Sequence, residues 1–332
     1  MRAVLVKELK NRDAVGLGEA PEPSPGAQEI LVEVAASSVN FPDILMMDGK
    51  YQIRPEPPFV LGKEAAGTVI GLGAGVGEGA NGFALGDRVI VEVDYGGFAD
   101  RLVAPAAAAF KIPEEMDFPT AAAMGLVYQT AWLALFPRAG MQKGDVVLVN
   151  GASGGVGMAA VELARAYGAT VLAGLTTPSK AAAVKAAGAH HVIDLSRNGL
   201  RDSLRQQVHD AVGKRGVDIV VDMLGGTPFE ASLRALAFAG RAVVIGFAAG
   251  EIPAVRTNYL LLKNIAVMGS TFNGYLEQRP DLVARAHTEI LGLWRDGKLK
   301  ANIMRSYPVE EARQALADVE NRKVTGKIVI TF

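Results

Sequence analysis

The sequence predicts an α/β protein in which a β-rich lobe precedes a doubly wound parallel sheet. The first indication is the apolar run 146–149, which leads through a glycine-rich turn, Gly151–Gly157, straight into a helical pattern. The second is the regular alternation of short apolar runs with helical patterns between residues 124 and 272, which is typical of right-handed βαβ units. The third is the preceding part, up to residue 123, where short apolar runs are separated by Gly and Pro.

Three parts follow from these patterns: residues 1–123, 124–272 and 273–332. In the first part, strands are expected at 30–34, 66–70 and 88–93. In the second part, the six expected strands are 146–149, 170–173, 191–194, 217–222, 241–246 and 265–269. The helices expected between them are 156–167, 179–187, 200–212 and 228–239. In the last part, helices are expected at 284–294 and 310–320, followed by a strand at 327–331.

The segment from Phe118 to Pro137 contains no charged residue and is nearly long enough to span a membrane. It holds Thr120, Tyr128, Gln129 and Thr130, however, and the positive flanks of a spanning helix are missing. A buried core helix is therefore expected, and no membrane association.

The glycine-rich turn predicts a dinucleotide site, because it stands between a strand and a helix. Glycines let the backbone approach a pyrophosphate, and the free N–H groups at the start of the helix attract its charge. The residues expected to form this part of the site are Ser153, Gly154, Gly155, Val156 and Gly157.

The next strand, 170–175, indicates which dinucleotide is bound. A site for NAD usually places an acidic residue at the end of this strand, against the ribose 2′-hydroxyl. No acidic residue occurs here between Glu162 and Asp194; the strand instead runs past Gly174 into Thr176, Thr177 and Lys180. These residues favour NADPH as the cofactor. The alternative is that Lys180, like Lys185, belongs only to the solvated face of the next helix.

Composition excludes several other classes of protein. The net charge of −1 shows no excess of basic residues of the kind that binds nucleic acid. The chain contains no cysteine, which excludes disulfides and thiolate chemistry and agrees with a cytoplasmic location. Its start, Met1–Glu8, has the pattern of a strand and not of a signal peptide.

The chain resembles the zinc-independent quinone oxidoreductases (zeta-crystallin-like) of the medium-chain dehydrogenase/reductase superfamily over essentially its whole length. The resemblance rests on short blocks in the family's order, which are residues 38–43, 49–51, 62–67, 86–89, 97–99, 151–157, 218–226, 246–253, 260–264 and 325–327. It implies a Rossmann NADPH-binding domain at 124–272, a GroES-like catalytic domain at 1–123, and a C-terminal segment, 273–332, that returns to the catalytic domain.

The same resemblance bears on metal binding. Zinc enzymes of the superfamily carry a Cys near the position of Asn40 and a His before the glutamate that corresponds to Glu64. This chain has Asn40 and Lys63 at those places, and no block of four cysteines precedes Gly97. No metal site is therefore expected. Lys63 could lie near the cofactor or form an ion pair with Glu64 or Asp43, and Glu64 is expected to be structural.

By resemblance, two residues of the first part are assigned to the reaction. Asn40 corresponds to a residue that reaches the nicotinamide ribose, or it caps its own turn. Tyr51 corresponds to a residue that lines the substrate pocket and could donate a hydrogen bond or a proton, although solvent could also supply that proton. The resemblance further assigns Thr130, Phe247 and Arg322 to the cofactor. Leu195 stands where many relatives carry a Tyr, so one phosphate contact is in doubt unless Arg197 replaces it.

The expected activity is hydride transfer from NADPH to a small-molecule quinone or α,β-unsaturated carbonyl, without metal. The alternatives are an enoyl-thioester reductase, an alcohol dehydrogenase, or a non-catalytic NADPH-binding protein. A homodimer is also expected, because the apolar last strand of the sheet, Ile265–Ser270, would leave an unprotected edge that a second copy could cover.

Overall fold

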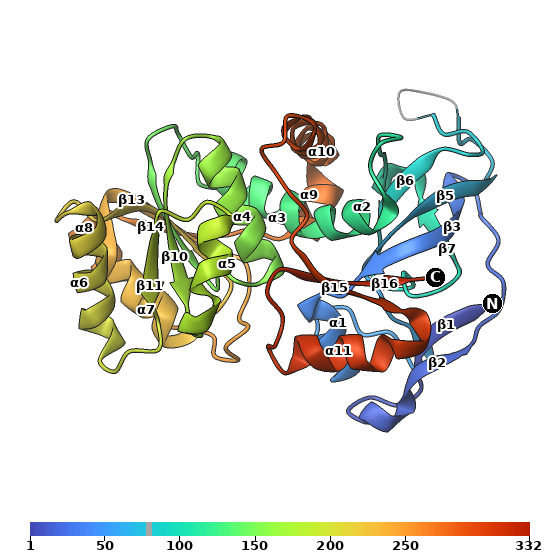
Figure 1. Cartoon of the computed structure of the whole chain (residues 1–332), viewed down its shortest axis with the longest axis horizontal. Coiled ribbons are helices and arrows are strands. Elements are labelled where there is room, and N and C mark those ends of the chain that lie inside the picture. The colour runs from blue at the N-terminus through green and yellow to red at the C-terminus, as the bar shows by residue number, and fades with distance from the viewer. Residues whose placement is uncertain (78–81) are drawn as a thin grey trace. The chain divides into compact units, whose positions relative to one another are not determined.

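A computed structural model describes residues 1–77 and 82–332 of the chain. The chain divides into two compact units, which are described separately. Unit 1 comprises Met1–Leu126 and Ala301–Phe332, and unit 2 comprises Val127–Lys300. Figure 1 shows both units with most of their helices and strands labelled. The segment 273–300, which the sequence analysis grouped with the C-terminal part, belongs to unit 2.

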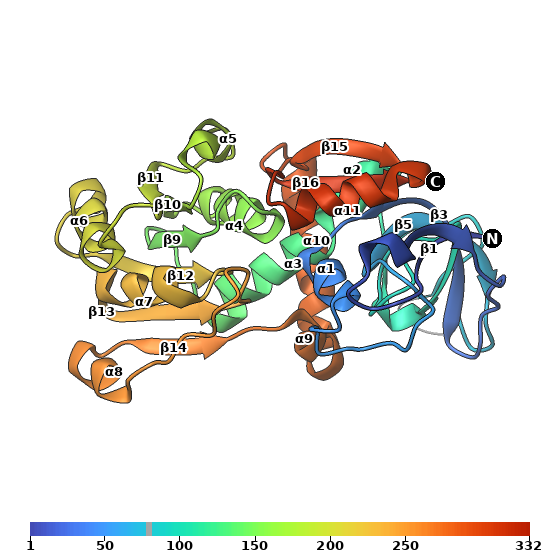
Figure 2. The ribbon, with the colours of Figure 1, turned by 90° about the horizontal axis from the view of Figure 1, so that it is seen from below.

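Unit 2 contains the predicted parallel sheet. Its strands lie in the order β11-β10-β9-β12-β13-β14 and are all paired in parallel. Figure 2 shows them one below another, from β11 to β14. Their bounds are β9 Val146–Asn150, β10 Thr170–Leu175, β11 His191–Asp194, β12 Val217–Asp222, β13 Leu236–Val244 and β14 Ala266–Gly269. This order reverses direction beside β9, the first strand, as in doubly wound nucleotide-binding sheets.

Helices cover this sheet and pack through apolar side chains. Val146 and Leu148 of β9 belong to one buried cluster with residues of α6 and α7, such as Leu204 and Phe229. The helices of unit 2 are α3 Leu126–Leu133 (which begins at the last residue of unit 1), α4 Gly155–Ala166, α5 Ala181–Ala186, α6 Leu200–Val212, α7 Gly226–Ala235, α8 Thr257–Lys263, α9 Phe272–Gln278 and α10 Pro280–Arg295.

Three predicted helices differ from the structure by more than two residues. The helix expected at 284–294 begins already at Pro280. The helix expected at 228–239 ends at Ala235, because Leu236 already pairs with Val217 of β12 and Ala239 has a positive φ of 60°. The single helix expected between 118 and 137 is broken at Gly125 into α2 (Phe118–Met124) and α3, followed by a π-helical turn, Ala134–Arg138. Within the described ranges, no helix is long and apolar enough to cross a membrane.

Unit 1 is built mainly from antiparallel strands, as expected of the β-rich part. One sheet has the order β2-β1-β4, and the larger sheet has the order β15-β16-β3-β5-β6-β8, with β7 also paired to β3. The strands are β1 Arg2–Val6, β2 Val15–Glu19, β3 Glu29–Ser38, β4 Phe59–Val60, β5 Glu64–Leu72, β6 Arg88–Glu92, β7 Arg101–Pro105, β8 Ala109–Lys111, β15 Ile303–Pro308 and β16 Lys327–Thr331. Its helices are α1 Phe41–Met47, α2 and α11 Ala312–Glu320.

The larger sheet of unit 1 joins distant parts of the sequence. Strand β16, from the end of the chain, pairs with β3 through Val329 and Ser38, and β3 pairs with β5. This arrangement brings Lys327, Asn40 and Glu64 together in the core.

Candidate functional site

The glycine-rich turn of unit 2 follows β9 and leads into the first turn of α4. Gly151 has a positive φ of 76°, and an added Cβ on Gly157 would lie 2.2 Å from the carbonyl oxygen of Gly151. Only glycine can therefore occupy position 157 without moving the turn. Gly154 is exposed and precedes the helix as its N-cap, without a side-chain cap. The first N–H groups of a helix lack partners inside it, so this turn offers donors to a phosphate.

The end of β10 completes the region predicted to bind the cofactor. Gly174 lies in β10, where an added Cβ would lie 2.9 Å from Oδ1 of Asn150 and 3.0 Å from Cδ1 of Leu195. Thr176 and Thr177 are exposed, and Lys180 is half-buried at the start of α5. Burial lowers the pKa of Lys180. The structure thus brings together Ser153–Gly157 and Gly174–Lys180 at the carboxyl ends of the neighbouring strands β9 and β10.

A buried polar network that the sequence analysis did not identify lies between β9 and β12. Nδ2 of Asn150 donates to Oδ1 of Asp222 and to Oγ of Ser232, both at 2.8 Å. The second oxygen of Asp222 accepts a hydrogen bond of 2.7 Å from the backbone N–H of Gly225. Burial raises the pKa of Asp222 to about 6. The network fixes the loop after β12 at the point where the strand order reverses, which is where such sheets bind ligands.

The other residues assigned to the cofactor come from different elements of the two units. Thr130 is buried in α3, and Phe247, 40% exposed, follows β13. Leu195 is buried, and Arg197, which was considered as a replacement phosphate contact, lies 3.6 Å from Asp194 in an exposed ion pair. Arg322 belongs to unit 1, where it follows α11 with a positive φ of 57°.

The core of unit 1 contains a cluster of buried polar side chains around Glu64. Oε1 of Glu64 accepts hydrogen bonds from Nδ2 of Asn40 at 2.8 Å and from the hydroxyl of Ser38, and Oε2 accepts one of 2.8 Å from the N–H of Leu126. Nζ of Lys327 lies 3.4 Å from Oε1 of Glu64. Glu64 thus fixes the segments that carry Asn40 and Leu126.

Both the oxygen and the nitrogen of the Asn40 side-chain amide form hydrogen bonds. Its oxygen accepts a hydrogen bond of 2.7 Å from Lys327, while its Nδ2 donates to Glu64 and to the carbonyl of Ser38. Its backbone N–H donates to Asp43 at 2.7 Å and thereby caps α1. Asn40 is thus a fixed, buried amide, and its use by a cofactor remains a prediction.

Lys63 does not form the ion pair predicted with Glu64 or Asp43. Its Nζ lies 3.6 Å from the carboxylate of Asp94 and 3.3 Å from the carbonyl oxygen of the same residue. It also lies 5.2 Å from the centre of the Tyr51 ring, within the range of a cation–π contact. The Lys63 side chain is almost completely buried, and a buried charge needs an opposite charge beside it. The carboxylate of Asp94, which lies at the surface, supplies that charge.

Tyr51 is half-buried and packs against the core of unit 1. Burial, with Asp94 and Asp43 nearby, raises the pKa of Tyr51. The phenol therefore stays protonated near neutrality and is a hydrogen-bond donor there. Asp43 is fully buried, and burial raises its pKa to about 7.

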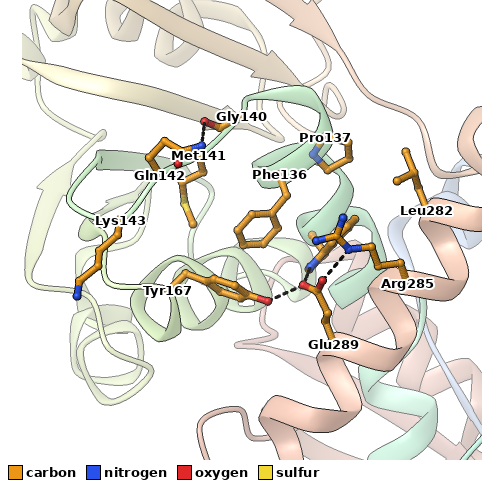
Figure 3. A pocket seen from close by; sticks show the side chains of 11 residues that line it. Phe136, Pro137, Gly140, Met141, Gln142, Lys143, Tyr167, Leu282, Arg285 and Glu289 are labelled. Carbon is orange, nitrogen blue, oxygen red and sulfur yellow. Dashed lines mark hydrogen bonds and ion pairs between the residues drawn. The ribbon is translucent and has the colours of Figure 1, made fainter.

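Unit 2 also has a hollow of about 520 Å³ lined by aromatic residues, shown in Figure 3. Trp132 and Tyr167 both donate to the Glu289 carboxylate, at 2.9 and 2.6 Å, and Arg285 binds its other oxygen at 2.8 Å. The charged and polar groups at its base thus satisfy one another. The residues that line this hollow include members of α10, α3 and the end of α4. The Glu289 carboxylate is already bound by its neighbours, so no ligand is needed to balance it.

Over residues 1–77 and 82–332, no group of three or more His, Cys, Asp or Glu side chains could hold a metal ion.

The chain matches two family models, the alcohol dehydrogenase GroES-like domain over residues 26–114 and the zinc-binding dehydrogenase domain over residues 155–288. It is 36% identical to quinone oxidoreductase-like protein 2 of Bos taurus, covering 100% of this chain and 92% of that protein. It is 32% identical to quinone oxidoreductase of Homo sapiens, covering 99% and 97% of the two chains.

Among solved structures, that of mycobacterial Rv1454c complexed with NADPH is similar, with a TM-score of 0.91, 30% identity and 100% of both chains covered. A quinone oxidoreductase of Pseudomonas syringae gives a TM-score of 0.90 at 27% identity, covering 100% and 99% of the two chains. These findings confirm the predicted fold, with a Rossmann-like parallel sheet in unit 2 and a GroES-like β-rich unit 1. The chain belongs to the medium-chain dehydrogenase/reductase superfamily, in its branch of quinone oxidoreductase-like proteins.

Proposed function

We propose that this protein reduces quinones or α,β-unsaturated carbonyl compounds by hydride transfer from NADPH. The observation that carries the proposal is the end of β10, where Thr176, Thr177 and Lys180 follow Gly174 without an acidic residue. A carboxylate at this position would repel the 2′-phosphate of NADPH. The NADPH complex of mycobacterial Rv1454c, a structure of the same fold, supports the same choice of cofactor.

The residues around the glycine-rich turn fit the cofactor. Gly157 leaves room for the tight turn, and the N–H groups that begin α4 would bind the pyrophosphate. Lys180 and the two threonine hydroxyls would bind the 2′-phosphate by charge-assisted and neutral hydrogen bonds. When bound, NADPH supplies the hydride.

On the substrate side, we assign the reaction to Asn40 and Tyr51 of unit 1. Asn40 is held rigidly by Glu64 and Lys327, so its amide would contact the cofactor without further ordering. The Tyr51 phenol is a protonated donor and would stabilise the negative charge that develops on the acceptor oxygen. Solvent supplies the proton in this scheme, because a phenol with a raised pKa is a weak acid.

The proposal is tested by following NADPH oxidation with a panel of ortho-quinones, para-quinones and enones. Turnover with quinones or enones supports it. Turnover only with enoyl thioesters would show the enoyl-reductase alternative, and oxidation of alcohols with NADP⁺ the alcohol dehydrogenase. Tight NADPH binding without turnover of any acceptor would instead indicate a non-catalytic NADPH-binding protein.

We further propose that two copies associate through β14. This strand is the last of the six in its sheet, and Val267 and Met268 are only partly buried. An apolar edge of this kind invites pairing with the same strand of a second subunit. Val267→Pro should remove a ladder donor and give monomer or precipitate. A wild-type chain that elutes as a monomer at micromolar concentration in light scattering would contradict the proposal.

A further inference from the structure

Two glutamates face each other in the core of unit 1. Glu64 of β5 and Glu92 of β6 are direct partners in the antiparallel register, and both are buried. An added Cβ on Gly125 would lie 2.6 Å from Oε1 of Glu92 and 2.7 Å from Oε2 of Glu64. The two carboxyl groups therefore converge on the same backbone position. Directly opposed like charges destabilise a strand pair, so two ionised groups are not expected here.

Hydrogen bonding distinguishes the two carboxyl groups. Glu64 accepts from Ser38, Asn40, Leu126 and Lys327, which is the environment of an ionised carboxylate. Both oxygens of Glu92 are buried and have no hydrogen-bond partner among the described residues. Buried polar groups almost always have partners, and an ionised carboxylate without donors would be especially costly. A protonated Glu92, by contrast, would itself be a donor.

The charges of the cluster lead to the same assignment. The groups that act on Glu92 are Glu64 on the facing strand, Lys63 directly before that strand, and Lys327 on β16. Glu64, whose Oε1 lies 3.4 Å from Nζ of buried Lys327, balances the charge of that lysine without a second charge on Glu92. Asp94 adds a further carboxylate beside Lys63, but at the surface. Burial, and next the charge of Glu64, raise the pKa of Glu92 well above its usual value.

We propose that Glu92 is a neutral carboxylic acid at physiological pH, that its O–H donates to Oε2 of Glu64, and that it thereby holds Glu64 and Asn40 in place. Glu92 is a positioning residue, because it reaches Asn40 only through Glu64. The value of this positioning for catalysis rests on the proposed function. The protonation state and the hydrogen bond do not, and both are measured without turnover.

Infrared spectroscopy of the full chain tests the protonation state. The spectra are recorded at about pH 7.5 in the Asp43→Asn background, because the pKa of Asp43 is about 7 and that group would add a band of its own. The Asp43→Asn protein should show the C=O band of a protonated carboxylic acid. The band should disappear in Asp43→Asn/Glu92→Gln. Absence of the band in Asp43→Asn, or its persistence in Asp43→Asn/Glu92→Gln, would overturn the proposal.

Selective ¹⁵N labelling of asparagine tests the positioning. The side-chain amide signal of Asn40 is identified by its loss in Asn40→Ser. It should be nearly unchanged in Glu92→Gln, whose NH₂ can still donate to Glu64, and displaced in Glu92→Leu, which cannot donate. Thermal unfolding of each variant verifies that it is folded. An unchanged Asn40 signal in folded Glu92→Leu would overturn the positioning role. If the band and signals behave as expected but no acceptor is reduced, only the proposed function fails.

Discussion

The two candidate sites of this protein are formed by different kinds of chemical groups. In unit 2, the region predicted to bind the cofactor consists of backbone, with glycines at 151, 154, 155 and 157 and the N–H groups that begin α4. In unit 1, the region around Asn40 consists of buried charged side chains, with Lys327 and Glu64 in contact. The turn of the first site leaves no room for an added side-chain atom at Gly157, whereas the second site depends on the balance of its buried charges. Each of the following predictions tests one side of this difference.

The largest effect is expected from Lys327→Met. Lys327 donates to Asn40 at 2.7 Å and to the carbonyl of Val39 at 3.1 Å, and its loss would leave Glu64 without its buried cation. Breaking a buried pair on one side costs about 3–5 kcal/mol of unfolding free energy. The matched control is Lys111→Met, which removes an exposed ion pair with Asp87 and should cost about 1 kcal/mol or less. Equal shifts of the urea midpoint in both variants would show that the cluster does not stabilise unit 1.

In unit 2, the single charge expected to contribute most to NADPH binding is that of Lys180. Lys180→Glu should weaken NADPH binding by about 1.5–3 kcal/mol, or roughly tenfold or more, through loss of a charge-assisted contact. Binding of NADH, which lacks the 2′-phosphate, should change far less. Lys185→Glu, on the exposed face of α5, is the matched control and should leave both affinities nearly unchanged. Equal losses for both cofactors would assign Lys180 to the solvated surface.

The backbone nature of the unit 2 site is tested by Gly157→Ala. The added methyl would lie 2.2 Å from the carbonyl oxygen of Gly151, so the turn must shift. Such overpacking costs about 1–3 kcal/mol of stability, and NADPH binding should weaken with it. At Gly154 the nearest atom to an added Cβ is 3.6 Å away, so Gly154→Ala should unfold at nearly the wild-type temperature. A Gly157→Ala variant as stable as wild type would contradict the turn as described.

A smaller effect concerns pH. The pKa of Asp43 is raised from 3.8 to about 7 on folding, so the native state binds more protons than the unfolded state between these values. Its contribution to stability is complete below about pH 4 and is lost as the pH rises through about 7. Asp43→Asn should remove this component while still accepting the N–H of Asn40. Urea unfolding of both proteins at about pH 5 and pH 8 measures the difference; parallel curves would contradict it.

The sequence predicted unit 2 better than unit 1, for a physical reason. Strands such as 191–194 and 217–222, and the helix 200–212, are local patterns, and the structure has them at the predicted residues. The helix expected at 228–239 was too long because pairing of Leu236 with β12 is a tertiary effect. Gly125 was not recognised as a break, since the group that binds the following N–H is Glu64, far away in sequence.

The polar cluster of unit 1 could not be assembled from the sequence. Asn40 was singled out, and Lys63 was considered either near the cofactor or in an ion pair with Glu64 or Asp43, whereas its ion pair is with Asp94. Glu92 and Lys327 were missed, because nothing local shows that a glutamate ending one strand will face Glu64, or that a lysine beginning the last strand will reach Asn40. The signal that the sequence offered is a glutamate that directly follows the apolar run of a strand, as in Arg88–Glu92.

The most direct test of the proposed activity follows the transferred hydride itself. NADPH that carries deuterium in place of both hydrogens at C4 of the nicotinamide is incubated with the protein and an enone, and the product is analysed by mass spectrometry and NMR. Hydride transfer predicts one deuterium at the β-carbon of the reduced product and a solvent proton at its α-carbon. Cofactor that stays unoxidised with every acceptor, or a reduced product without deuterium, would contradict the account.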